Sequence, residues 1–489
     1  MENTFSIPNA VSRITETLEN AGFEAYLVGG CVRDLFLGRV PKDWDVTTNA
    51  NPDQVIALFS KTFYENNYGT VGVVNEDETD ETLKIIEVTP YRTEGLYTDG
   101  RRPDSVSFDA SLEDDLQRRD FTINAIAFNV SKNVVVDTFY GRQDLQKGII
   151  RTVGKPESRF GEDALRILRA IRLHAELGFA IDEETKEGIT KTSALLEKIA
   201  KERIRDEFTR MIMSQNPMEA MLVAEKLGVL QYIAPQLLDA IGVEQNQAHA
   251  FDVWTHLLKS LQHSADREWP LHIRLAALFH DISKPETRRK SKTGEWTFYG
   301  HEVVGARRTK KILEDLRFSK ELTDTVVKLV RWHMFFSDTE QITLSAVRRM
   351  IANVGKDNVW DLMNLRMCDR IGTGRPKEDP YRLRKYKAMI EEVMHDPVSV
   401  GMLALNGQEL METLSIPASP KIGAILHALL QIVLENPELN KKEILIEKAR
   451  ELTILSDEDL RKQGDLGKEK REEEEAKILK KIRGKYKVQ

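Results

Sequence analysis

The fold of this 489-residue chain is decided by two neighbouring runs, Tyr26-Leu27-Val28-Gly29-Gly30-Cys31-Val32-Arg33-Asp34 and Lys42-Asp43-Trp44-Asp45-Val46. The first run predicts an apolar strand that enters a Gly-Gly turn and continues at once into a helix. The second predicts another strand. Because side chains alternate across a strand, Asp43 and Asp45 are expected on the same face. Adjacent carboxylates suit Mg²⁺, which binds one or two of them together with substrate phosphates.

The Gly-Gly turn adds a place for a phosphate chain. Glycines at 29 and 30 let backbone N–H groups and a helix N-terminus approach a triphosphate closely, and Arg33 contributes a permanent cation. Taken singly, a Gly-Gly pair is usually a turn and an Asp-x-Asp pair is usually a solvated loop. In this order and over so short a span, they predict a metal-dependent nucleotidyl-transfer site.

This arrangement resembles the head domain of the class II nucleotidyltransferases of the polymerase-β superfamily, a group that contains tRNA CCA-adding enzymes and bacterial poly(A) polymerases. The resemblance implies that Asp43 and Asp45 are catalytic and hold Mg²⁺. It also implies nucleotide-binding roles for Gly29, Gly30, Arg33 and Asp34.

A second run, Arg118-Arg119-Asp120-Phe121-Thr122-Ile123-Asn124-Ala125, supplies two guanidinium groups, which suit bidentate binding of phosphate and ribose oxygens. The alternative is a set of surface ion pairs. The run resembles the second motif of the same family, and the resemblance implies nucleotide binding by Arg118, Arg119, Asp120 and Asn124. In the run VVDTFYGRQDL, Asp137, Gly141 and Asp144 resemble the next motif, which joins head to neck, and we expect them to form a turn and a helix cap.

Two features between these motifs leave alternatives open. Glu87 is either a third acidic group near the metal or an exposed strand residue. The run PYRTEGLYTDGRRPDSVSF predicts a mobile loop and resembles the loop that helps the family switch from C to A addition. Its candidate residues are Arg92, Tyr97, Asp99, Arg101 and Arg102.

The segment Gly161-Glu162-Asp163-Ala164-Leu165-Arg166-Ile167-Leu168-Arg169 is predicted to be helical, which would place Asp163 and Arg166 on the same face. Cytosine and adenine both offer an amino donor beside a ring-nitrogen acceptor, so an Asp–Arg pair can bind both and leave uracil and guanine unpaired. The pattern resembles the protein template of class II CCA-adding enzymes, which implies nucleotide binding by Asp163, Arg166 and Arg169. The later run 202–207 resembles another family motif, which we interpret as neck structure that holds this helix.

A second constellation lies further along the chain. Histidines on helices are usually core or surface residues, but a His-Asp dipeptide that ends an apolar helix, with histidines on both sides and an aspartate downstream, provides the ligand types of a divalent metal site. The order resembles the HD phosphohydrolase superfamily. This resemblance implies that the core metal ligands are His256, His280, Asp281 and Asp369. It also implies that His301 and His333 complete a second metal position. His249 is a further candidate ligand, and Lys284 a candidate phosphate-binding group.

The HD resemblance also implies a divalent ion, Mg²⁺, Mn²⁺, Ni²⁺ or Co²⁺, and a phosphatase or 2′,3′-cyclic phosphodiesterase activity on RNA ends. A bound ion would activate water for cleavage of a phosphoester.

The composition limits the classes of partner that the protein can be expected to bind. The formal net charge is −7, which excludes a generally basic nucleic-acid binder and requires any RNA surface to be a local patch. The two cysteines argue against a disulfide framework. The first residues show no signal pattern and no apolar run is long enough to cross a membrane, so we expect a cytoplasmic protein with no membrane partner. Residues 477–487 carry six basic and no acidic side chains, either an RNA contact or a solvated helix.

Together these patterns predict an α+β head with a mixed sheet and helices, followed by an all-α neck, HD region and tail. We expect the head at 1–150, the neck at 151–240, the HD domain at 241–380 and the tail at 381–489. Individual elements are predicted as a helix at 9–21, strands at 24–28, 43–47, 69–74, 82–89, 124–130 and 134–138, and neck helices at 162–177, 183–200, 201–214 and 217–227.

The predicted function is two-metal addition of CCA to the tRNA 3′ end from CTP and ATP. The sequence leaves open a poly(A) polymerase, a CC-only or A-only enzyme and, from another class, an HD phosphohydrolase with a nucleotide-binding head. It also leaves the oligomeric state open.

Overall fold

The computed structural model describes residues 5–64, 69–95, 106–246, 250–335, 342–395 and 400–488. They form two compact units. The first unit comprises Met1–His333 and Asn364–Pro376, and the second comprises Met334–Met363 and Lys377–Gln489.

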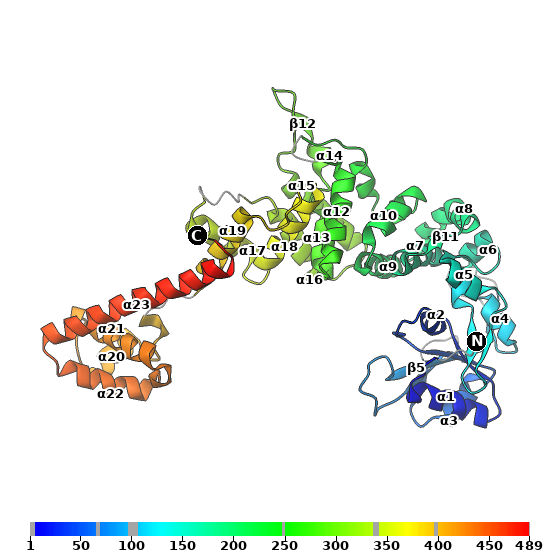
Figure 1. Ribbon diagram of the computed structural model, residues 1–489, viewed down its shortest axis with the longest axis horizontal. Coiled ribbons are helices and arrows are strands. Elements are labelled where there is room, and N and C mark those ends of the chain that lie inside the picture. The colour runs from blue at the N-terminus through cyan, green and yellow to red at the C-terminus, as the bar shows by residue number, and fades with distance from the viewer. Residues whose placement is uncertain are drawn as a thin grey trace. The chain divides into compact units, whose positions relative to one another are not determined.

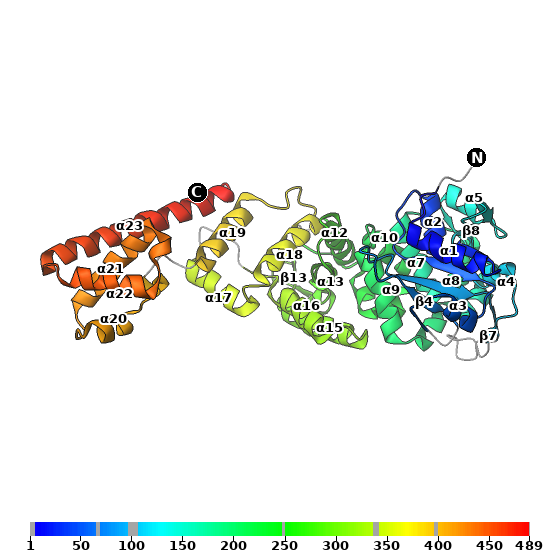
Figure 2. The same ribbon diagram turned by 90° about the horizontal axis from the view of Figure 1, so that it is seen from below.

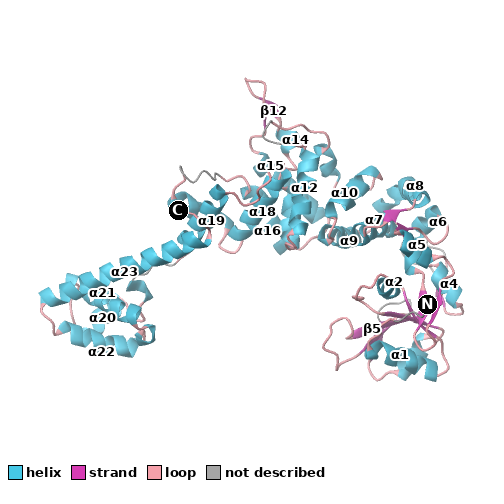
Figure 3. Cartoon of the chain, viewed as in Figure 1, coloured by secondary structure: helices cyan, strands magenta, loops and turns pink. Residues whose placement is uncertain are grey.

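The N-terminal part of the first unit is built on a seven-stranded mixed sheet with the strand order β3-β4-β5-β2-β1-β8-β9. Strands β2 and β5 run parallel, and the other neighbours are antiparallel. The strands are β1 (Ala25–Val28), β2 (Asp45–Thr48), β3 (Thr62–Tyr64), β4 (Val71–Val74), β5 (Ile85–Pro90), β8 (Ala127–Asn129) and β9 (Val134–Val136). Figure 3 shows most of the strand structure gathered here, so the predicted α+β head is confirmed.

Helices cover this sheet. They are α1 (Asn9–Asn20), α2 (Gly30–Phe36), α3 (Pro52–Leu58), α4 (Leu112–Gln117) and α5 (Gly141–Lys147). Apolar residues of α1 recur with the helical period, so Ala10, Val11, Ile14 and Leu18 form one buried stripe. Helices α1 and α3 contact each other and lie together beside the sheet (Figure 1).

The neck and HD regions are mainly helical. Their principal helices are α6 (Pro156–Glu162), α7 (Leu165–Leu177), α8 (Glu183–Thr192), α9 (Lys201–Met213), α10 (Pro217–Lys226), α11 (Leu230–Ile233), α12 (Val253–Asp266), α13 (Leu271–Phe279), α14 (Lys284–Thr287), α15 (His301–Asp315) and α16 (Lys320–Trp332). Two short strand pairs interrupt them. Strands β10 (Ile149–Ile150) and β11 (Ala180–Ile181) are parallel, and β12 (Arg289–Lys290) and β13 (Trp296–Thr297) form an antiparallel hairpin. The expectation that 241–380 is helical throughout is therefore wrong at this hairpin.

Several predicted boundaries also move. Strand β2 begins at Asp45, which leaves Asp43 in the preceding bend. The predicted helix at 162–177 is broken, because Asp163 ends α6 in an extended conformation (φ −145°, ψ 104°) and α7 begins at Leu165. The predicted helix at 183–200 ends at Thr192 and continues as a 3₁₀ segment, η2 (Ser193–Lys198). Short strand β3 and the pair β6 (Thr93–Glu94) and β7 (Val106–Ser107) were not predicted.

The second unit is an all-helical bundle. It contains α17 (Leu344–Val354), α19 (Tyr381–Met394), α20 (Gly407–Leu414), α21 (Pro420–Glu435), α22 (Lys442–Thr453) and α23 (Asp457–Lys485). Helix α18 (Val359–Gly372) contributes to both units. Helix α23 lies alongside α21 (Figures 1 and 2), over a core that includes Leu405, Leu410, Ile425 and Leu429.

The basic end of α23 is paired within this unit. Arg483 Nε lies 2.7 Å from Glu392 Oε1, and Lys485 Nζ lies 2.7 Å from Glu391 Oε2. Two of the six basic residues at 477–487 are thus held by α19. Across the described part of the chain, no helix has both the length and the apolar character of a membrane span.

Candidate functional site

The Gly-Gly turn brings the two predicted catalytic carboxylates together. Gly29 has φ +81°, and α2 begins at the next residue. A Cβ atom at Gly29 would lie 3.2 Å from Arg119 Nη1 and 3.3 Å from Asp45 Oδ2, and one at Gly30 would lie 3.8 Å from Asp43 Oδ1. Strand alternation does not explain this placement, because Asp43 precedes β2. Nevertheless both carboxylates and Arg119 meet at this turn.

Nearby arginines compensate only in part for the burial of the Asp45 carboxyl group. Burial is the main cause that raises its pKa to about 6, Asp43 adds to the rise, and Arg119 and Arg169 oppose it. Asp45 also pairs in parallel register with Glu87 on β5, whose side chain is exposed. Parallel partners in register lie on the same face of the sheet, so Glu87 is on the face that carries Asp45. Carboxylate oxygens such as those of Asp43 and Asp45 suit a divalent cation with oxygen ligands.

The arginines of the second motif are held by an aspartate that the sequence analysis missed. Asp115 on α4 is fully buried, and its carboxylate lies 2.6 Å from Arg118 Nη2 and 3.1 Å from Arg119 Nη2. Burial alone would raise the pKa of Asp115, but the two guanidinium groups outweigh it and hold the pKa below its usual value. The spacings of three and four residues from Asp115, near the end of α4, are a signal that could have predicted these pairs.

Asp120 joins the head to the neck. It is buried, and its carboxylate accepts from the Phe121 N–H at 2.8 Å and the Asn124 amide at 3.1 Å, while Arg169 Nη2 of α7 lies 2.9 Å away. Burial opposes ionisation, but Arg169 and these hydrogen bonds lower the pKa of Asp120. Arg33 Nη1 donates to Asn124 Oδ1 at 2.9 Å. Arg33, Asp120, Asn124 and Arg169 are therefore one network, and Asp34 pairs with Arg33 at 2.9 Å.

The predicted nucleotide-selecting pair is arranged differently from the expectation. Asp163 and Arg166 do not lie on one continuous helix, because the chain is extended at Asp163. Asp163 pairs with Arg203 of α9 at 2.7 Å. Arg166 pairs with Glu162 and donates to the carbonyls of Arg159 and Arg118 at 3.1 and 3.3 Å. Each member of the pair is thus fixed by its own partner of opposite charge.

The interpretation of run 202–207 as a support for α7 is confirmed by contacts. Arg203 holds Asp163, and Glu207 pairs with Arg172 of α7 at 3.1 Å. Glu162 and Arg203 are the partners that the sequence analysis did not assign. The spacing of Glu162 and Arg166 was a signal for the first pair, but no local pattern predicts a contact across 40 residues.

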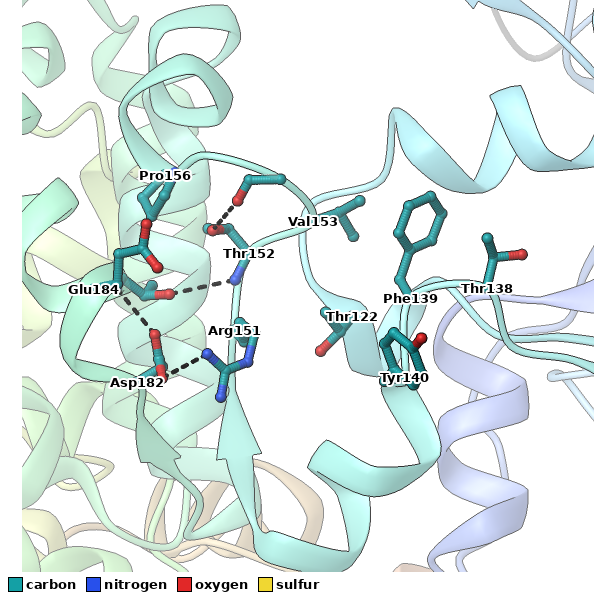
Figure 4. A pocket seen from close by; sticks show the side chains of 12 residues that line it. Thr122, Thr138, Phe139, Tyr140, Arg151, Thr152, Val153, Pro156, Asp182 and Glu184 are labelled. Carbon is teal, nitrogen blue, oxygen red and sulfur yellow. Dashed lines mark hydrogen bonds and ion pairs between the residues drawn. The ribbon is translucent and has the colours of Figure 1, made fainter.

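A cavity of about 220 Å³ lies where head and neck meet. Figure 4 shows Arg151 facing Asp182 on one side and Phe139 and Tyr140 on the other. Arg151 lies 2.8 Å from Asp182 and 3.2 Å from Asp144, so it ties the two regions together.

The turn that precedes α5 also behaves as predicted. Asp137 caps α5 by accepting from the Gly141 N–H at 2.7 Å. A Cβ atom at Gly141 would lie 2.2 Å from the Thr122 carbonyl oxygen, so only glycine fits there.

The second candidate site lies among α12, α13, α15, α16 and α18. Its six predicted ligands are all buried and form two sets that share Asp281, namely His256, His280, Asp281 and Asp369, and Asp281, His301 and His333. Asp281 Oδ2 lies 3.0 Å from His256 Nε2 and 3.3 Å from His280 Nε2. Its other oxygen, Oδ1, lies 3.0 Å from His301 Nε2 and 3.4 Å from His333 Nε2.

Backbone carbonyls orient three of these histidines. The Nδ1 atoms of His280, His301 and His333 lie 2.9, 2.6 and 2.7 Å from the carbonyl oxygens of residues 277, 298 and 330. Donation from Nδ1 leaves the Nε2 lone pairs directed at the centre, which is the usual support for a metal-binding histidine. Two such Nε2 atoms, of His301 and His333, face each other at 3.3 Å. Adjacent ligands of an octahedral ion are about 3 Å apart, so the set fits a shared cation.

The ligands differ in the direction of their pKa shifts. Burial lowers the pKa of His256 and His333, which favours the neutral, ligating form, whereas Asp281 and Asp369 outweigh burial and raise the pKa of His280. Asp281 is buried, yet Lys284 and His280 hold its pKa well below the usual range. Lys284 Nζ lies 2.6 Å from Asp281 Oδ2. His249 and the loop residues Tyr97, Asp99, Arg101 and Arg102 lie outside the described residues.

Comparison with known proteins supports the head and the HD region as domains. Three family descriptions match: "Poly A polymerase head domain" over residues 25–151, "Probable RNA and SrmB- binding site of polymerase A" over 178–241, and "HD domain" over 248–355. The CCA-adding enzyme of Lactiplantibacillus plantarum is 32% identical over 445 residues, which are 90% of this chain and 95% of the relative.

The chain belongs to the CCA-adding enzyme family. Another family member, from Geobacillus thermodenitrificans, is 32% identical over 433 residues, which are 88% of this chain and 93% of that protein. Among solved structures, the Bacillus stearothermophilus CCA-adding enzyme in complex with CTP is 28% identical, with a TM-score of 0.59. The match covers 91% of this chain and 98% of the solved chain. The resemblance to this family, predicted from the head motifs, is therefore confirmed.

Proposed function

We propose that this member of the CCA-adding enzyme family adds CCA to the 3′ end of tRNA, with CTP and ATP as substrates. The observation that carries the proposal is the meeting of Asp43, Asp45 and Arg119 at the Gly29–Gly30 turn. Because the proposed substrate is tRNA, the proposed location is the cytoplasm.

In this proposal Asp43 and Asp45 hold Mg²⁺, with Glu87 beside them. Bound cations would polarise the attacking RNA 3′-hydroxyl and stabilise the pyrophosphate that leaves. The glycine turn gives the triphosphate close access to backbone N–H groups, and Arg119, anchored by Asp115, presents a fixed cation beside it. The head network through Asp120 and Arg169 keeps α7 in position.

Nucleotide choice is assigned to Asp163 and Arg166. The carboxylate accepts from the amino group of cytosine or adenine, and the guanidinium donates to the neighbouring ring nitrogen. Uracil and guanine present the opposite polarity and leave both groups unpaired, which a site of this kind rejects strongly. The partners Arg203 and Glu162 orient the two side chains before the base arrives.

The test uses a tRNA transcript that lacks its 3′-CCA, with Mg²⁺ and CTP alone, ATP alone or both, and resolves products at single-nucleotide length. We expect two additions with CTP and a stop after a third with both nucleotides. A long ladder with ATP would indicate a poly(A) polymerase, and a stop at CC, or A added only to a CC end, would indicate a split activity. Asp45→Ala should abolish addition without unfolding the protein.

We also propose a second activity, hydrolysis of phosphoesters at RNA ends, including terminal phosphates and 2′,3′-cyclic phosphates. The convergence of two ligand sets on Asp281 favours it. The six ligands would hold two divalent ions, Mg²⁺, Mn²⁺, Ni²⁺ or Co²⁺, which supply an activated water when bound. Lys284, 2.6 Å from Asp281, is positioned to bind the substrate phosphate.

The test measures phosphate release from a phosphate-ended RNA and from a small phosphoester with each of the four ions. Wild type should be active with at least one ion, and the double variant His280→Ala/Asp281→Ala should be inactive. The control is His427→Ala, which removes a half-buried histidine of α21 in the other unit. Equal inactivity of wild type and the double variant with all four ions would contradict the proposal.

A further inference from the structure

The hairpin β12–β13 is an irregular insertion between the two ligand-bearing segments of the HD site. Arg289 pairs with Thr297 and Lys290 with Trp296, and the turn is closed by the Ser291 N–H, which donates to the Glu295 carbonyl at 2.8 Å. It projects beyond the helices around it in Figure 1, where β12 is labelled. The chain thus leaves the helical core after α14 and returns to it only at α15.

Both ends of this hairpin reach the HD ligands. On the leading side, Lys284 begins α14 and contacts Asp281. On the returning side, the carbonyl of Phe298 lies 2.6 Å from His301 Nδ1 and so helps to orient that ligand. Lys284 Nζ also lies 5.5 Å from the centre of the Phe298 ring. The hairpin is thus joined on both sides to residues that contact the HD ligands.

The surface of the hairpin is basic in an acidic chain. Residues 288–299 contain four basic side chains and one carboxylate, whereas the whole chain has a net charge of −7. Arg289, Lys290 and Lys292 are exposed. Among the described residues, Arg288 is the one of the four basic groups that pairs with a carboxylate, 3.6 Å from Glu244. Three exposed cations are thus available to an anionic partner.

Aromatic rings lie among these cations. The Arg288 guanidinium carbon lies 3.6 Å from the centre of the Trp296 ring, and Lys290 Nζ lies 5.1 Å from it. Tyr299, at the foot of the hairpin, is 88% exposed. Basic side chains that follow a phosphate backbone, with aromatic rings that stack on bases, are the combination used to bind single-stranded nucleic acid.

We propose that the hairpin binds single-stranded RNA, with the backbone along Arg289, Lys290 and Lys292 and a base stacked on Tyr299, and directs the RNA end to the HD centre. The last step rests on the proposed phosphohydrolase function, whereas the binding step does not. This assigns to the HD site a polynucleotide substrate in preference to a free nucleotide or a small phosphoester.

The first arm of the experiment measures binding of a fluorescent six-nucleotide single-stranded RNA to the full chain over a range of salt concentrations. The variant Arg289→Ala/Lys290→Ala/Lys292→Ala should bind at least tenfold more weakly. The slope of its log affinity against log salt should fall by about 2, since each single-strand phosphate contact contributes about 0.7. Tyr299→Ala should weaken binding about fivefold or more at every salt concentration.

The control removes the same charge elsewhere. Lys310→Ala/Lys311→Ala/Lys320→Ala takes three exposed cations from α15 and its neighbour α16 and should retain the wild-type slope. A hairpin variant that behaves like this control overturns the proposal. Binding of phosphatidylglycerol vesicles by the hairpin, with no RNA binding lost in the variant, would also overturn it in favour of a membrane surface.

The second arm compares kcat/KM for a 3′-phosphorylated RNA with that for a small phosphoester. The ratio of the two should fall at least tenfold in the hairpin variant and stay constant in the control. If wild type hydrolyses neither compound, the phosphohydrolase function fails, and the binding arm still decides the hairpin. If wild type hydrolyses both and the ratio is the same in the hairpin variant, the hairpin does not serve the HD centre.

Discussion

Asp45→Asn is expected to stabilise the head while it abolishes nucleotide addition. Ionisation of Asp45 destabilises the folded protein, because burial and the neighbouring Asp43 raise the pKa of Asp45 to about 6 against an ordinary value of 3.8. Above pH 6 the carboxylate is charged in both the folded and the unfolded state, so the free energy of unfolding is lowered by the full amount. Between pH 6 and pH 3.8 the folded state takes up the proton first, so this cost shrinks as the pH falls.

The size of the effect follows from the same values. A difference from 3.8 to about 6 corresponds to about 3 kcal/mol. Part of the Asp45 side chain is exposed to solvent, and screening reduces this figure, so we expect a gain of about 1–2 kcal/mol at pH 7.5. The neutral amide of asparagine removes the charge and keeps the shape of the side chain.

The assay is amide hydrogen exchange of the full chain in EDTA, read at β1 and β2. The variant should show exchange that is slower by about 5- to 30-fold at pH 7.5, the equivalent of 1–2 kcal/mol. After correction for intrinsic exchange rates, the difference should decline below pH 6 and vanish near pH 4. Added Mg²⁺ should protect wild type and leave the variant unchanged, because a ligand stabilises only the protein that binds it.

The control is Asp43→Asn, which removes the same charge from an exposed position in the bend before β2. It should also stop nucleotide addition, but it should slow the exchange of β1 and β2 less than Asp45→Asn does, because burial, and not Asp43, is the main cause of the raised pKa of Asp45. Equal or faster exchange in Asp45→Asn at pH 7.5, or a difference that does not vary with pH, would refute the electrostatic reasoning.

Three further changes test other contacts. Asp115→Asn leaves Arg118 and Arg119 without their buried partner and should lower the free energy of unfolding of the head by about 2–3 kcal/mol; hydrogen exchange measures this, with Glu113→Gln, at an exposed position of the same helix, as control. Arg203→Ala releases Asp163 and should raise KM for CTP and ATP about tenfold or more, with Arg205→Ala unchanged, and an unaltered KM would contradict the role of this pair. His301→Ala should reduce bound metal from about two ions per chain to about one, measured by elemental analysis, whereas Asp281→Ala should leave almost none.

Local patterns predicted much of the head. The strands around Leu27 and Val46 follow from short apolar runs, and the glycine turn follows from its sequence. The same patterns misplaced Asp43, which the structure puts in a bend, although it still reaches the site because the turn at Gly30 passes close to it. The order of the residues therefore predicted where the site lies, but not the backbone conformation at Asp43.

Contacts between segments that are distant in the sequence could not be predicted from local patterns. The extended residue Asp163, where the helix is broken, forms an ion pair with Arg203, 40 residues away. The hairpin at Arg289–Thr297 was hidden because two-residue strands are too short to show an alternating pattern. The HD ligands were predictable by type and order, whereas the sharing of Asp281 between two sets required the packing of five helices.

The sharing of Asp281 between the two ligand sets decides which substitutions inactivate the whole HD centre. Because Asp281 presents one oxygen to His256 and His280 and the other to His301 and His333, a substitution that removes the whole carboxylate, such as Asp281→Ala, takes a ligand from both sets. Where hydrolysis is no longer under selection, one such substitution at Asp281 can therefore inactivate both ligand sets, whereas a substitution at His301 leaves the four-residue set intact. Among close homologues, position 281 is where retained and abandoned hydrolysis should separate most cleanly.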